Sequence, residues 1–155
     1  MSIQDQQGRS GAGTEAGVQR VTIANDSTGA IGSTSPYPKG ATPITAASGN
    51  VANATATATL AAVAGKTTYI TGFTVTGTGA TAGLAVSVSV AGTITTGLTY
   101  TSAAAVGALI ANTPLIVRFN PAVPASATNI AIAVSIPALG LGNTNSTVVA
   151  HGYQL

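Results

Sequence analysis

The chain has 155 residues, with five Lys or Arg side chains and only three acidic ones, Asp5, Glu15 and Asp26. Because no carboxylate side chain follows Asp26, most of the chain lacks the clustered acids of a glycosidase, a two-metal site or a calcium cage. The absence of cysteine and the single His151 exclude a zinc site within one chain, so the composition predicts a protein that is not an enzyme and that binds no cofactor or metal.

The net charge of +2 comes from scattered cations, whereas nucleic-acid binding needs clustered ones with aromatic residues between them. No apolar run reaches the length of a transmembrane helix, and aromatic residues, at 4%, are too few for the girdles of a membrane barrel. We therefore expect neither nucleic acid nor a membrane as a partner. Alanine, threonine and glycine make up nearly half of the chain, which predicts a thin core supplemented by burial between subunits.

Residues 1 to 49 are predicted to be an arm and a linker. The first 17 are polar and rich in glycine, and prolines interrupt the stretch from 28 to 49. Between them lies one short extended segment, which could add to a sheet edge on a partner or form the first strand of the chain's own sandwich. Four of its residues are the candidates for docking onto a capsid or another partner: Val18, Arg20, Val21 and Ile23.

Residues 50 to 155 are predicted to form a run of strands. Two segments alternate strictly between apolar and small polar side chains, at Leu84–Ala91 and Ile130–Ile136. In another run, Tyr69 and Phe73 are expected on one face together with Thr71 and Val75. Further strands are expected at 51–63, 93–101, 114–120 and 147–153, and the stretch from 102 to 112 is interpreted as a loop or one turn of helix.

This spacing of about seven to eight strands, without helical crossovers, predicts an all-β fold with antiparallel pairing. Two facing sheets bury such half-apolar strands, so the expected architecture is a β-sandwich of the jelly-roll type. Within it, Arg118 lies between two apolar neighbours and is expected to face solvent, while His151 is interpreted as a packing or surface residue. The glycine-rich stretches 77–83 and 140–143 are interpreted as turns rather than phosphate loops.

Three segments carry a resemblance to a family. AAVAGKTTYITGFTVTGTGATA (61 to 82) and PASATNIAIAVSIPALGLGNTNSTVVAHGYQL (124 to 155) are similar to small phage and prophage virion proteins, whose pattern is an opening strand P-A-x-A-G-K-x-x-Y-I-T-G and a final V-x-x-x-G-Y strand. GVQRVTIANDSTGA (17 to 30) resembles a recurrent amino-terminal segment of phage structural proteins.

The resemblance implies a capsid decoration, or cement, protein of a tailed bacteriophage. Such a protein is made in the host cytoplasm and resides in the virion, on the capsid surface. Its implied partners are the major capsid protein and copies of itself, as a trimer. The alternative is a tail- or fibre-associated module that binds a carbohydrate or host receptor, although the few aromatic residues favour the structural role.

Overall fold

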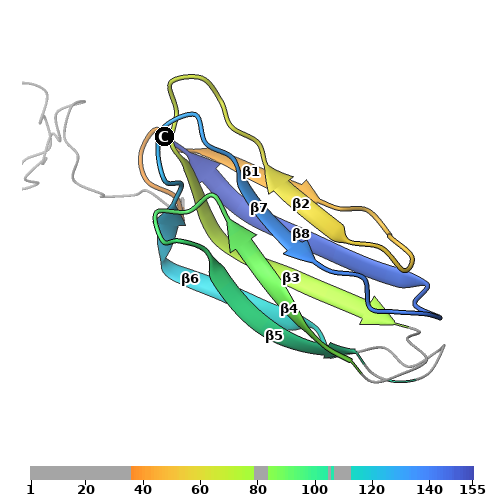
Figure 1. The fold of residues 1–155 in the computed structure, drawn as a ribbon. Coiled ribbons are helices and arrows are strands. Elements are labelled where there is room, and N and C mark those ends of the chain that lie inside the picture. The colour runs from red at the N-terminus through yellow and green to blue at the C-terminus, as the bar shows by residue number, and fades with distance from the viewer. Residues whose placement is uncertain (1–35, 79–83, 105, 107–112) are drawn as a thin grey trace, which may run out of the picture. The chain divides into compact units, whose positions relative to one another are not determined.

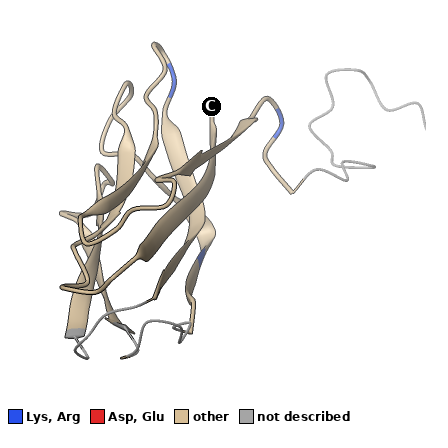
Figure 2. Cartoon of the chain, turned by 90° about the vertical axis from the view of Figure 1, so that its right-hand side faces the viewer, with Lys and Arg blue, Asp and Glu red and all other residues tan. Residues whose placement is uncertain are grey.

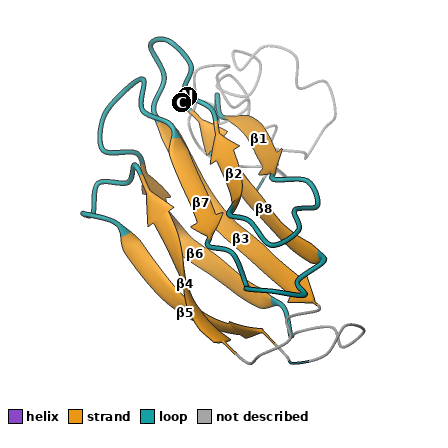
Figure 3. Cartoon of the chain, turned by 45° about the vertical axis from the view of Figure 1, so that its right-hand side comes forward, coloured by secondary structure: helices purple, strands orange, loops and turns teal. Residues whose placement is uncertain are grey.

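The structure is a computed structural model that describes residues 36–78, 84–104, 106 and 113–155. Apart from Pro36, these residues belong to one compact unit, Tyr37–Leu155. They form strands and loops (Figure 3), and no helix among them is long and apolar enough to cross a membrane. The strands are β1 (Thr42–Ala47), β2 (Ala56–Leu60), β3 (Thr68–Thr78), β4 (Leu84–Ala91), β5 (Leu98–Ala104), β6 (Leu115–Pro124), β7 (Ile132–Ile136) and β8 (Asn145–Gln154).

The eight strands form two antiparallel sheets with the orders β1-β8-β3-β6 and β2-β7-β4-β5 (Figure 1). Four of the pairings are nested around the β4–β5 pair: β4 pairs with β5, β3 with β6, β2 with β7 and β1 with β8. The eight strands can therefore be described as one long antiparallel hairpin whose two arms meet at the β4–β5 pair. This hairpin folds over on itself, so that β3 also pairs with β8 and β4 with β7. This arrangement is the jelly roll, which confirms the predicted fold class.

The strict alternations place their apolar side chains in the core as predicted, except Ile130, which lies before β7 and is exposed. In β4, Val86, Val88 and Val90 are buried, while Ser87 and Ser89 are exposed. In β7 the buried positions are the apolar ones, namely Ile132, Val134 and Ile136. Because side chains alternate across a strand, one face of each sheet packs inward and the other is left outside.

The prediction for β3 is wrong in one respect. Tyr69 and Phe73 were expected on the same face, but a bulge lies between Ile70 and Gly72 and shifts the register against both neighbouring strands. Ile70 faces the core before the bulge, and Phe73 and Val75 face it afterwards. The extra residue at a bulge reverses the alternation, so Tyr69 lies on the outer face instead.

The core between the sheets combines a few alanines with a larger number of valine, isoleucine and leucine side chains. Two of its positions on β2 are alanines, Ala56 and Ala58. The largest fully buried side chain is Phe73, whose ring centroid lies 5.4 Å from that of Tyr100 and 6.2 Å from that of Phe119. Only at the alanine positions does the core remove little apolar area from water.

The strand β1 comes from within residues 1 to 49, for which the sequence predicts arm and linker. It pairs with β8 along its whole length, from Thr42 opposite Gln154 to Ala47 opposite Val149. Pro43 is tolerated there because β1 is the edge of its sheet, where the missing N–H of a proline breaks no ladder hydrogen bond.

Candidate functional site

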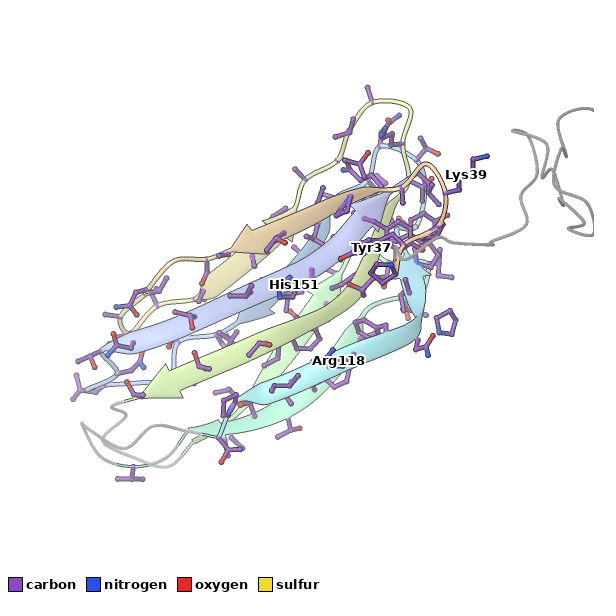
Figure 4. The ribbon with its side chains drawn as sticks, turned by 180° about the vertical axis from the view of Figure 1, so that it is seen from behind. Tyr37, Lys39, Arg118 and His151 are labelled. Atoms are coloured by element: carbon purple, nitrogen blue, oxygen red, sulfur yellow. The ribbon has the colours of Figure 1, made fainter. Side chains whose placement is uncertain are left out.

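The outer face of the β1-β8-β3-β6 sheet contains a hollow of about 490 Å³. Its floor is the bulged part of β3, residues 71–74, and one wall is the β6 segment 116–120. His151 on β8 and Tyr37, in the segment before β1, complete the lining. Figure 4 looks onto this face, with Arg118 on β6, His151 on β8 and Tyr37 toward the end of the sheet where β1 begins.

The hollow is centred on Gly72. The sheet register places Gly72 opposite His151 on one side and opposite Arg118 on the other. Glycine is required at this position because a Cβ atom would lie 2.5 Å from the carbonyl oxygen of Val117. The backbone of β6 therefore packs closely against Gly72, which is buried, and the partners of Gly72 in the row across the sheet are Arg118 on one side and His151 on the other.

Hydrogen bonds hold His151 within this row. Nδ1 of His151 lies 3.5 Å from Oγ1 of Thr45 on β1, and the Thr71 hydroxyl donates to the His151 carbonyl oxygen over 3.0 Å. Arg118 is exposed, and its half-buried neighbours Val117 and Phe119 face inward, as the sequence predicts. Among the described residues, the guanidinium of Arg118 has no hydrogen-bond or ion-pair partner.

Three tyrosines cluster beside the hollow. The rings of Tyr69 and Tyr153 stack with centroids 4.8 Å apart, and Tyr37 meets the edge of Tyr153 at 5.8 Å. Burial raises the pKa of the Tyr153 hydroxyl above its usual range, and the neighbouring Tyr69 raises it further. Tyr37, which the sequence places in the linker, is therefore tied to the end of this sheet.

The outer face of the other sheet has a different character. Its outward positions on β2, β4, β5 and β7 are occupied by alanine, serine and threonine alone. Ser87 lies opposite Thr101 and Ser89 opposite Thr99, and the hydroxyl groups of Thr57 and Ser135 are 2.8 Å apart. This face has no charged side chain and no large one, so it is flat and uncharged.

The docking candidates Val18, Arg20, Val21 and Ile23 lie outside the described residues. The hollow itself was not predicted, because its row joins β1, β8, β3 and β6, which are far apart in the sequence. The one local signal is Gly72, since a glycine inside a strand pattern often marks a bulge or a close backbone approach.

The hollow is lined by a cation, an imidazole, hydroxyls and an amide, together with three aromatic residues and the aliphatic side chains of Ile116 and Val117. The described part of the chain holds no cluster of three or more His, Cys, Asp or Glu that could bind a metal ion. The lining can therefore donate hydrogen bonds and attract an anion, but no carboxylate within it could orient His151 as a base. Comparison with protein-family models, with curated proteins and with solved structures finds no match to this chain.

Proposed function

We propose that the chain is a virion structural protein of the capsid decoration type, which binds the outer surface of a phage head. The resemblance of residues 61 to 82 and 124 to 155 to phage virion proteins supports this function. In the proposal, the jelly roll contacts the major capsid protein and further copies of itself, and these contacts stabilise the shell.

The observation that carries the proposal is the scarcity of charge on the surface. In the described part of the chain the Lys and Arg residues are Lys39, Lys66 and Arg118, and there is no Asp or Glu. Figure 2 shows these cations in blue on an otherwise uncharged ribbon. Soluble domains carry charge on roughly a quarter to a third of their surface residues. Charged residues are depleted at the centre of protein interfaces. The low charge of the outer face of β2-β7-β4-β5 is therefore the feature that supports its burial against a partner, since alanine and serine are themselves under-represented at interfaces.

The small side chains favour close contact between sheets or with a shell. Alanine, serine and threonine extend little from the backbone, so a partner surface can approach the outer face of β2-β7-β4-β5 closely and lose little rotamer entropy. The alanines in the core add a second reason, because area buried between copies supplements the small area that these side chains bury within one chain.

The direct test is mass spectrometry of heads and tails separated from phage particles that encode the chain. The proposal expects the chain in the head fraction, in a fixed ratio to the major capsid protein. Recovery from tails alone would favour the receptor-binding alternative, and absence from both fractions would contradict a virion role.

Self-association has its own test. At micromolar concentration, sedimentation equilibrium of the purified chain is expected to give a trimer, three times the 14.9 kDa mass of one chain. A monomer that unfolds cooperatively at the same concentration would contradict the proposed contacts between copies.

The second candidate function is a tail- or fibre-associated module that recognises a carbohydrate. The hollow over Gly72 favours it, since the hollow combines polar side chains with the ring of Tyr37 in a concave site of ligand size.

A further inference from the structure

The hollow over Gly72 has the geometry of a small-molecule site. Its volume of about 490 Å³ lies within the range of roughly 300 to 1,000 Å³ that ligand pockets occupy. Gly72, one of its lining residues, is fixed by the close approach of the Val117 carbonyl oxygen, so this part of the hollow is set by the pairing of β3 with β6. Apart from Tyr37, which precedes β1, the lining residues lie on β3, β6 and β8.

The charge of the hollow selects for an anion. Arg118 contributes a guanidinium that has no partner among the residues the structure describes, and the lining contains no carboxylate. A guanidinium offers parallel N–H donors that match the two oxygens of a carboxylate. His151, on the other side of Gly72, supplies a second group that can donate to the same ligand.

The remaining lining combines polar groups with apolar ones, among them the exposed Ile116, and so suits a body that has both polar and apolar faces. Thr71 and Thr74 on β3 carry hydroxyls, and Asn120 on β6 carries an amide, so the hollow offers several donors and acceptors. The ring of Tyr37 provides an apolar surface at one end. The volume exceeds what an isolated carboxylate or phosphate would fill, and this leaves room for a ring that bears hydroxyl groups.

We propose that the hollow binds a saccharide that carries a carboxylate, of the uronic acid class. Arg118 holds the carboxylate, and the hydroxyls of the sugar ring meet Thr71, Thr74, Asn120 and His151. Tyr37 packs against the apolar side of the ring. The hollow is the same whether the chain resides on a head or on a tail. A failure of the saccharide proposal would therefore leave the decoration function untouched, and the reverse also holds.

The experiment is an NMR titration of the full ¹⁵N-labelled chain at constant ionic strength. Sodium glucuronate is expected to shift the amide resonances of residues 71–74 and 116–120 with saturation. Glucose is the matched neutral probe, because it differs from glucuronate only at the carboxylate carbon. We expect glucose to bind about tenfold more weakly or worse, since it cannot form the charge-assisted pair.

Two variants test whether Arg118 is the residue that binds the carboxylate of glucuronate. Arg118→Gln is expected to reduce glucuronate affinity to that of glucose while leaving the circular dichroism spectrum and the oligomeric state unchanged, because Arg118 is exposed. Lys39→Gln removes the same charge from an exposed turn that does not line the hollow, and it is expected to leave the affinity within twofold.

Four results would overturn the proposal. The first is the absence of a saturable shift with glucuronate, and the second is an unchanged affinity in Arg118→Gln. Equal or tighter binding of inorganic phosphate would make the hollow a general anion site. Tighter binding of N-acetylglutamate would assign it to an acidic side chain of a partner protein instead.

Discussion

Asn143 is the polar residue whose replacement is expected to destabilise the jelly roll most clearly. Its side chain is 3% exposed and lies in the turn between β7 and β8. Oδ1 accepts hydrogen bonds from the backbone N–H of Asn53 (2.9 Å) and the hydroxyl of Ser146 (3.0 Å). Nδ2 donates to the carbonyl oxygens of Thr78 (2.7 Å) and Asn145 (3.0 Å). One amide thus ties together the β1–β2 connection, the end of β3 and the start of β8.

Asn143→Ala removes all four hydrogen bonds at once. Each is worth about 1 kcal/mol net, and a group left buried without a partner costs about 1 to 3 kcal/mol. Water can reach some of the part-buried partners in the variant, which limits the loss. We therefore expect the free energy of unfolding to fall by about 2 to 4 kcal/mol.

The assay is urea unfolding followed by circular dichroism, at one protomer concentration for all variants because association contributes to stability. Thr144→Ala is the matched control: the side chain is exposed and accepts one hydrogen bond, from the amide of Asn145. It is expected to cost less than about 0.5 kcal/mol. A loss below about 1 kcal/mol in Asn143→Ala would refute the assignment of this amide as a structural tie.

Two further variants test the sheet that carries the hollow. A Cβ at Gly152 would lie 2.1 Å from the backbone carbonyl of Tyr69, whereas a Cβ at Gly77 would meet the end of the Leu139 side chain. Gly152→Ala is therefore expected to lower the urea midpoint much more than Gly77→Ala does, and equal losses would contradict this reasoning. Burial holds the pKa of Tyr153 above its usual value of about 10. The stabilisation linked to its protonated form is complete below pH 10 and is lost as the pH rises through the raised pKa. Tyr153→Phe keeps the stacked ring, so unfolding curves at pH 8 and pH 11 should show a smaller alkaline loss in the variant than in the natural chain.

The parts of the fold that were predictable are those with a local pattern. In β4, valine alternates with serine, and this period of two fixes both the strand and its buried face. The position of β1 was not predictable in the same way, since Pro43 argues against a strand unless the strand is known to lie at an edge. Edge position is a property of the whole sheet and has no local signature.

The hollow was beyond prediction for a related reason. Arg118 and His151 each appear as ordinary outward residues on their own strands. They lie on either side of the same residue only through β3, whose bulge sets Gly72 opposite both of them. The register between strands so distant in sequence depends on the jelly-roll topology. A single glycine inside a strand indicates a bulge, but it does not indicate which residues lie opposite it on the neighbouring strands.

The long antiparallel hairpin has a consequence for the order in which the chain folds. The pairing of β4 with β5 joins strands that follow one another, while that of β1 with β8 joins the first and last strands of the sandwich. The entropy of loop closure grows with the length of chain enclosed, and folds dominated by distant contacts form slowly. We expect the β4–β5 hairpin to nucleate folding and the pairs to close outward from it. The row of His151, Gly72 and Arg118 would then be assembled late, once β8 has joined β3.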